Sequence, residues 1–310
     1  MSQLTAATIA VTKPSITKGY LIALTATILW ATTGILISYL LTHYAIVPLT
    51  LACWRDVIVS SVLAVILAAV RPSLLRIRRQ DIPFFAAYGF FGVAVFNALW
   101  VYSVDFNGAT LAVVLVYTGP AFVAVAAHWF FHEPITRLKV LAIALSLVGC
   151  VLVTGAYDLT RLRLNPLGII AGVGVGMGFA FYSVFGKLSA PRYNPWAATA
   201  YSFGFGAFFL LLTQRPTQLV SMGNAPLGWL TLFVLGAGPT LVGFALYTVS
   251  LGYLPVSVAS LIATLEPVFT AIMAFFLLGE RLSTVQVVGA LLIIFGVITL
   301  RRRGLPFKIE

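Results

Sequence analysis

Charged side chains are scarce in this sequence. Only 9% of its 310 residues are Asp, Glu, Lys or Arg, against about 25% in an average soluble domain. Hydrophobic residues make up 61% of the chain, which is more than a soluble fold of this length buries in one or two cores. The scarcity of charge therefore excludes an ordinary soluble protein and indicates an all-α integral membrane protein.

Residues that carry catalysis or bind metals are also few. The three histidines, His43, His128 and His132, are scattered, and no HExxH motif is present. The two cysteines, Cys53 and Cys150, lie within apolar runs and lack the spacing of a metal or redox site. A Walker motif for ATP is missing as well. We therefore expect no metal and no cofactor, and a membrane-embedded enzyme is the least favoured function class.

Long apolar runs, divided by short polar or Pro/Gly-rich stretches, dominate the chain. A membrane-spanning helix needs about 20 mostly apolar residues. The runs predict ten such helices, with approximate bounds 19–41, 48–70, 82–103, 108–131, 135–155, 166–187, 195–213, 226–251, 254–278 and 284–300. The first run is longer than the apolar region of a signal peptide and no convincing cleavage pattern follows it, so we interpret it as a span.

The distribution of basic residues predicts the orientation. The net charge is +11, but the Lys and Arg residues gather between apolar runs, which favours a topology signal over nucleic-acid binding. If the N-terminus is cytoplasmic, the cytoplasmic segments hold Lys13, Lys18, Arg71, Arg76, Arg78, Arg79, Arg137, Lys139, Lys187, Arg192, Arg301, Arg302, Arg303 and Lys308. The external loops then hold only Arg161, Arg163, Arg215 and Arg281. The positive-inside rule thus predicts an even number of spans, with both termini in the cytoplasm. The expected location is a plasma (bacterial inner) membrane.

The chain also contains an internal duplication. At one spacing of 147 residues, Gly89, Pro120, Glu133 and Gly149 match Gly236, Pro267, Glu280 and Gly296, and Gly19 matches Gly168 at a spacing of 149. Each half holds five predicted spans, and because five is odd the second half enters the membrane in the opposite sense. The predicted organisation is a cytoplasmic tail at 1–18, a five-helix repeat at 19–157, an inverted five-helix repeat at 166–300 and a basic cytoplasmic tail at 301–310.

These landmarks resemble the drug/metabolite transporter superfamily, and within it the EamA-type ten-helix transporters. The resemblance rests on Trp30, Arg55 and the two blocks Pro120 to Glu133 and Pro267 to Glu280, and it covers about 19–300. It implies two inverted repeats, alternating access between them, and a central cavity lined by helices one, three, four, six, eight and nine. The closest functional analogy is with the YddG-type exporters of aromatic and other neutral amino acids. The string HisGluPro at 132–134 departs from the GlyGlu that the family often has.

We accordingly expect a secondary transporter that exports small organic solutes, amino acids or related metabolites. A phosphorylated cargo would call for several basic residues inside the spans, and only Arg55 lies well inside one. This favours a neutral or zwitterionic, amino-acid-like substrate. Export of hydrophobic or quaternary cations, the multidrug type of cargo, is the alternative, because Glu266 would attract them. The expected partners are the small-molecule substrate and the lipid bilayer, with no nucleic acid, for a chain acting as a monomer or weak dimer.

The candidate substrate-binding residues are aromatic or polar residues within the predicted spans: Trp30, Thr33, Asn97, Trp100, Tyr117, Tyr182, Tyr247 and Glu266. Rings with a polar edge suit an amphiphilic solute, although many rings in a chain that is 13% aromatic must instead pack or face lipid. A carboxylate such as Glu266 is costly near the bilayer centre unless it faces the interior or an aqueous path. Binding of a substrate ammonium, proton coupling and structural pairing all remain open for it.

Two further pairs are candidates for movement and gating. Pro120 and Pro267 occupy equivalent mid-span positions, where proline frees a carbonyl and kinks the helix, so we expect hinges there. Arg55 and Asp56 are neighbours whose side chains point about 100° apart on a helix and pair poorly with each other. An interfacial anchor or an inter-helix ion pair is one interpretation, and an outer gate or a contact to a substrate carboxylate is the other. The glycines at 168, 172, 174, 176 and 178 predict close helix packing.

Overall fold

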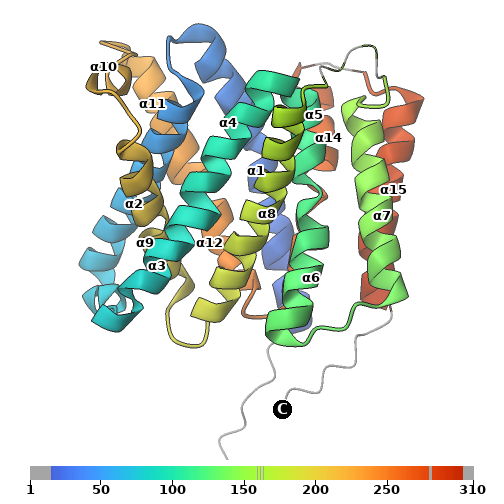
Figure 1. Cartoon of the computed structure of the whole chain (residues 1–310), viewed down its shortest axis with the longest axis horizontal. Coiled ribbons are helices and arrows are strands. Elements are labelled where there is room, and N and C mark those ends of the chain that lie inside the picture. The colour runs from blue at the N-terminus through green and yellow to red at the C-terminus, as the bar shows by residue number, and fades with distance from the viewer. Residues whose placement is uncertain (1–14, 159, 161, 163, 279–280, 303–310) are drawn as a thin grey trace, which may run out of the picture.

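The computed structural model describes residues 15–158, 160, 162, 164–278 and 281–302, and all regular elements among them are helical (Figure 1). The α-helices are α1 (Ile16–His43), α2 (Pro48–Val70), α3 (Ile82–Gly89), α4 (Phe96–Asn107), α5 (Ala109–Val116), α6 (Gly119–Phe131), α7 (Arg137–Thr154), α8 (Pro166–Ser189), α9 (Pro195–Leu211), α10 (Pro216–Leu219), α11 (Pro226–Leu235), α12 (Leu241–Ser250), α13 (Val256–Ala263), α14 (Glu266–Leu278) and α15 (Thr284–Arg302). Short 3-10 turns, η1 (Pro72–Leu75) and η2 (Arg79–Asp81), precede α3. The chain is a bundle of helices whose axes run between two opposite faces.

Within the described residues, eight helical stretches are long and apolar enough to cross a membrane. They are Ile16–His43, Pro48–Val70, Arg79–Asn107, Ala109–Phe131, Arg137–Thr154, Pro166–Ser189, Pro226–Ser250 and Val256–Phe276. A shorter apolar stretch lies in α15 at Thr284–Thr299, and α9 has 17 residues. Arg161, Arg163, Glu280 and the greater part of both predicted tails lie outside the described residues.

Helix starts follow from proline and asparagine. Pro166 and Pro195 occupy the first turns of α8 and α9, where a missing backbone N–H removes no helical hydrogen bond. Asn165 and Asn194 precede them and cap the helices through their side-chain oxygens. The polar stretches that divide the apolar runs are therefore also the signals that end one helix and begin the next.

Four of the long helices are interrupted, in two equivalent pairs. The π-helical segment η3 (Phe90–Val95) joins α3 to α4, and η5 (Gly236–Thr240), which contains Pro239, joins α11 to α12. Likewise α5 is separated from α6 at 117–118, and α13 from α14 at 264–265. Members of each pair stand about 147 residues apart. π segments are frequent at functional sites, and these interruptions lie in the third and fourth predicted spans of each half.

The final helices of the two halves, α7 and α15, pack closely against each other. A Cβ on Gly149 would lie 2.5 Å from the carbonyl oxygen of Gly289, and a Cβ on Gly296 would lie 3.0 Å from that of Ala142. Higher residue numbers on α7 thus face lower ones on α15, so the two helices run antiparallel. Small residues allow the backbones this approach.

In a second pair of contacts, the first helix of each half packs against the other half. A Cβ on Gly19 of α1 would lie 2.8 Å from Leu254, while a Cβ on Gly168 of α8 would lie 2.5 Å from Asn107. Gly19 matches Gly168 in the duplication, and Asn107 and Leu254 are 147 residues apart. Each half therefore places its first helix against the same point of the other half.

The glycines of α8 pack as the sequence predicted. A Cβ on Gly172 would meet Leu115 at 2.5 Å, one on Gly176 would meet Thr118 at the same distance, and one on Gly178 would meet Phe96 at 3.0 Å. Close packing against α4, α5 and the start of α6 confirms the interpretation of the glycine run as a packing surface.

The outer surface of the bundle is apolar. Large side chains such as Val65, Trp129, Ile170 and Phe276 are 68%, 74%, 69% and 76% exposed. In water such exposure would be unfavourable, whereas in a bilayer these groups contact lipid. In Figure 1, α1 begins and α15 ends at the same, lower face, where the connections from α2 to α3 and from α8 to α9 also lie.

Candidate functional site

A hydrogen-bonded network of charged and amide groups lies inside the bundle and joins α2 to α4. The Arg55 guanidinium donates to Asn97 Oδ1 at 2.7 Å, and Asn97 Nδ2 donates to Asp56 Oδ2 at 3.1 Å. The direct approach of Arg55 Nε to Asp56 Oδ1 is longer, at 3.9 Å. Asn97 therefore links two neighbours that, as their helical geometry predicted, pair poorly with each other.

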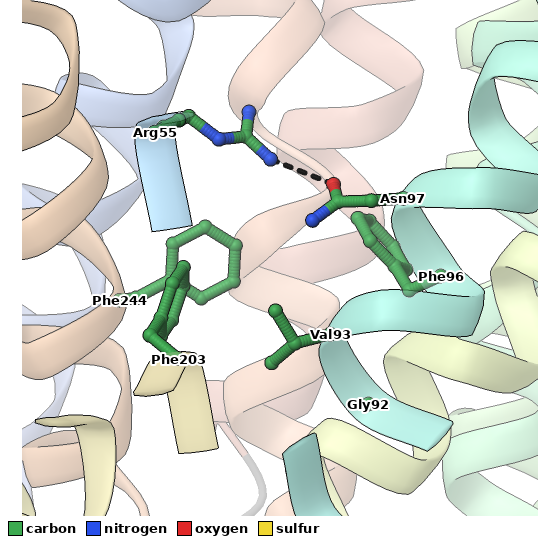
Figure 2. Close-up of a pocket in the computed structure, with 7 residues that line it drawn as sticks. All are labelled: Arg55, Gly92, Val93, Phe96, Asn97, Phe203 and Phe244. Carbon is green, nitrogen blue, oxygen red and sulfur yellow. Dashed lines mark hydrogen bonds between the residues drawn. The ribbon is translucent and has the colours of Figure 1, made fainter. Parts of the chain in front are cut away.

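This network borders a cavity formed by four parts of the chain (Figure 2). The cavity is lined by Arg55, Gly92, Val93, Phe96, Asn97, Phe203 and Phe244. Its volume is about 10 Å³, close to the 10–15 Å³ that one water molecule needs. Phe203 of α9 and Phe244 of α12 form one wall, facing Phe96 and Asn97 of α4. The arrangement presents one guanidinium beside several apolar rings.

The aromatic wall continues into a larger cluster. The Phe244 ring lies 4.8 Å from that of Trp30 and 5.1 Å from those of Tyr182 and Phe203, centroid to centroid. Tyr247 packs 5.2 Å from Trp30. Rings from α1, α8, α9 and α12 thus meet behind the cavity, and their packing fixes the wall that Phe244 presents to Arg55.

Several buried polar atoms around this cluster have no hydrogen-bond partner within the described chain. They include Arg55 Nε, Asp56 Oδ1, Trp30 Nε1 and Thr240 Oγ1. Unsatisfied buried polar groups are rare because each costs about 1–3 kcal/mol. Asp56 is fully buried and the Arg55 side chain is 12% exposed. Buried donors and acceptors that make no hydrogen bond are the groups that a site for a polar solute requires.

Glu266 belongs to a different neighbourhood. It lies at the start of α14, half-buried, in electrostatic contact with Tyr117 after α5 and with Cys150 of α7. Within the described residues, the two ion pairs are Arg55–Asp56 and Lys139–Glu133, so Glu266 has no cationic partner there. Pro120 and Pro267 stand directly after the breaks that precede α6 and α14.

A third polar group, the Glu133 cluster (Glu133, Lys139, Val256 and Ser257), joins the two halves. The Glu133 carboxylate accepts from the Val256 backbone N–H at 2.7 Å, from the Ser257 N–H at 3.4 Å and from the Ser257 hydroxyl. Lys139 Nζ lies 3.4 Å from the same carboxylate, and both side chains are buried. Glu133 thereby caps α13 from across the molecule, satisfying N–H groups that a helix start leaves free.

The other predicted site residues are dispersed. The Tyr182 hydroxyl pairs with Thr248 at 3.1 Å and the Tyr247 hydroxyl with Ser183 at 2.8 Å, so both polar edges are used between α8 and α12. Thr33 donates to the Trp30 carbonyl of its own helix at 2.6 Å. Trp100 is half-buried and does not line the cavity. The Arg55 side chain is largely buried and bonds Asn97 of the neighbouring helix α4.

Sequence reasoning missed the apolar lining and the Glu133 cluster. Val93, Phe96, Phe203 and Phe244 had no signal that separated them from the many other apolar residues of the spans. Glu133 stood out only as a landmark of the duplication, and its partner Ser257 is 124 residues away. Among the described residues no group of three His, Cys, Asp or Glu is placed to hold a metal, and Cys53 and Cys150 are buried free thiols.

Comparison with known proteins gives a family. The sequence profile described as the EamA-like transporter family matches the chain twice, at residues 17–155 and 166–302. An uncharacterized transporter of Archaeoglobus fulgidus is 30% identical over 212 residues, which cover 67% of this chain and 74% of the relative. A protein of Streptantibioticus cattleyicolor, named a probable terminal-alkyne amino-acid exporter, is 26% identical over 91% of this chain and 92% of its own length.

A solved crystal structure shares the fold. It matches with a TM-score of 0.77 at 20% sequence identity, and the match covers 94% of this chain and 100% of that one. At this identity the similarity concerns the arrangement of helices.

Proposed function

The chain belongs to the EamA-like transporter family of membrane transporters, and from that premise we propose that it exports small zwitterionic solutes of the amino-acid type. The observation that carries the proposal is the Arg55 network beside an aromatic wall, in which Arg55 Nε makes no hydrogen bond within the described chain. A guanidinium binds a carboxylate through two parallel hydrogen bonds. The Phe203 and Phe244 rings would receive the apolar part of the same solute.

The charge balance of the network favours a zwitterion. Arg55 and Asp56 together carry no net charge if both are ionised, and they are the charged groups that meet near the cavity. A solute with one carboxylate and one ammonium leaves this balance intact. A phosphorylated solute would bring two negative charges into a region with one guanidinium, at a high desolvation cost.

Ten crossings in two inverted halves are part of this proposal. The spans would be α1, α2, α3–η3–α4, α5–α6, α7, α8, α9, α11–η5–α12, α13–α14 and α15. Support comes from the antiparallel packing of α7 on α15, from the exchanged contacts of Gly19 and Gly168, and from the paired helix interruptions. The proposed repeats are 19–157 and 166–300, in a cytoplasmic membrane with both termini inside.

Movement of the halves follows from the size of the cavity. A volume of about 10 Å³ does not admit an amino acid, so loading requires helices to separate. The breaks beside Pro120 and Pro267 would be the hinges, since a proline removes a hydrogen bond and relaxes the helix there. The Glu133 cluster ties α6 and α7 to the start of α13 and would have to open when the lower face admits solute.

The test is uptake into proteoliposomes that contain the purified chain. Radiolabelled neutral amino acids should enter faster than into empty liposomes, and Arg55→Gln should abolish that uptake. Arg215→Gln, which removes an exposed charge outside the network and the cavity lining, is the matched control and should transport normally. If none of the labelled amino acids moves above empty liposomes, the proposed cargo is wrong.

Export of organic cations is a second candidate, because Glu266 has no cationic partner among the described residues. A hydrophobic cation would then depend on Glu266 and Tyr117 rather than on Arg55. The same liposomes loaded with labelled tetraethylammonium, a quaternary cation that the bilayer itself retains, decide between the two. Cation flux lost in Glu266→Gln and kept in Arg55→Gln would favour the second candidate over the first.

A further inference from the structure

A larger hollow, which we call the basic pocket, lies where α2 leads to α3 and α8 leads to α9. It is lined by Ser73, Leu74, Arg76, Arg78, Pro191, Arg192, Tyr193 and Asn194. Its volume is about 420 Å³, within the range of small-molecule sites. In Figure 1 these connections lie at the lower face, where α1 begins.

Positive charge predominates in the lining of the basic pocket. Three of its lining residues are arginines and none is acidic, and in the described part of the chain none of these arginines forms an ion pair. The nearby Asp81 carboxylate accepts a hydrogen bond from the Tyr193 hydroxyl. That hydrogen bond raises the pKa of Tyr193, so the phenol stays neutral and adds no negative charge.

Hydrogen bonds from the α2–α3 connection to the α8–α9 connection and to α9 hold the frame of the pocket. The Tyr193 hydroxyl accepts from the Arg78 backbone N–H at 3.3 Å, and the Tyr201 hydroxyl donates to the Leu75 carbonyl. Asn194, which lines the pocket, caps the 17-residue helix α9 by accepting from the Trp196 N–H at 3.0 Å. The positive end of that helix therefore lies at the pocket and adds to the attraction for an anion.

We propose that the basic pocket binds the phosphate group of an anionic phospholipid. The arginines supply donors in a geometry that suits phosphate oxygens, and the pocket lies where the helices end, which is the level of lipid headgroups. Exposed apolar residues stand on the adjoining helix ends: Val70 is 71% exposed, Ile82 41% and Leu188 40%. They offer acyl chains a surface next to the phosphate, which a soluble phosphate would not use.

Lipid titration of the purified full-length chain tests this assignment. Native mass spectrometry in a neutral detergent would follow binding of phosphatidylglycerol and, separately, phosphatidylcholine. We expect phosphatidylglycerol to bind about tenfold more tightly, because phosphatidylcholine carries the same phosphate but adds a quaternary ammonium that the three arginines repel. Arg78→Gln/Arg192→Gln should remove this preference, while Arg78→Lys/Arg192→Lys should keep part of it.

The matched control removes two exposed charges elsewhere, in Lys18→Gln/Arg137→Gln, and should retain the preference. If the control variant loses the preference for phosphatidylglycerol to the same extent, diffuse surface charge attracts the lipid, and the proposed site is wrong. No difference between the two lipids in the unmodified chain would overturn it as well. Displacement of phosphatidylglycerol by millimolar inorganic phosphate would assign the pocket to a soluble phosphate and refute the lipid assignment.

Discussion

Replacement of Glu133 by alanine is the perturbation whose effect the structure defines best. It removes a carboxylate that accepts hydrogen bonds from the Val256 N–H, the Ser257 N–H and the Ser257 hydroxyl. It also leaves the ammonium group of Lys139, whose side chain is fully buried, without its acidic partner. The change therefore removes the cap of α13 and also leaves the buried charge of Lys139 unpaired.

The magnitude follows from those contacts. Removing one member of a buried ion pair costs about 3–5 kcal/mol, because the other charge stays desolvated. Glu133→Gln keeps the volume and one acceptor oxygen but loses the charge, so a smaller loss of about 1–3 kcal/mol is expected from the unsatisfied ammonium. In Glu133→Ala/Lys139→Met the stranded charge is gone, and the loss should fall below the sum of the single losses by more than about 1 kcal/mol.

The two buried cysteines of the chain can report its unfolding. Cys53 and Cys150 are completely buried, so a dye that fluoresces on reaction with thiols reports unfolding in detergent. Denaturant titration of the unmodified chain, Glu133→Ala, Glu133→Gln, Lys139→Met and Glu133→Ala/Lys139→Met gives the five free energies of unfolding. A loss below about 1 kcal/mol in Glu133→Ala, or simple additivity in the double variant, would refute the reasoning that Glu133 and Lys139 form one buried unit.

Three further predictions concern packing, coupling and movement. Gly149→Ala places a Cβ 2.5 Å from the Gly289 carbonyl and should destabilise by about 1–3 kcal/mol. Gly34→Ala, with nothing within 4 Å, should be neutral or stabilise by up to about 1 kcal/mol; equal effects in the thiol assay would contradict this. Glu266→Gln should abolish the dependence of uptake on a pH gradient while solute exchange persists, and gradient-driven uptake that is unchanged would exclude Glu266 from proton coupling. Pro120→Ala restores a backbone donor and should lower the maximal uptake rate severalfold at constant KM, whereas a changed KM alone would contradict a hinge.

The helices could be predicted from the sequence because lipid makes each span a long apolar run. The predicted run at 48–70 has the bounds of α2, and the run at 82–103 falls within the stretch Arg79–Asn107. The positions at which these helices are interrupted could not be predicted. The π segment η3 contains no proline, and hydropathy alone does not distinguish it from regular helix.

The candidate site was predictable in part. Arg55 and Asp56 were conspicuous as charges within a span, and their poor direct pairing follows from the 100° between neighbours on a helix. That Asn97 bridges them depends on how α2 lies against α4, which no local pattern encodes. The capping of α13 by Glu133 likewise depends on tertiary structure, since a helix start is usually capped by its own preceding residue.

Recognition of a substrate carboxylate by Arg55 is the central claim, and competition between analogues tests it most directly. In proteoliposomes that exchange labelled phenylalanine, unlabelled phenylalanine and phenethylamine differ only by the carboxylate. Loss of hydrogen bonds to a charged group costs about 1.5–3 kcal/mol, so phenethylamine should compete at least about tenfold more weakly. Phenethylamine that competes as well as phenylalanine would show that no carboxylate is recognised, and would contradict the account.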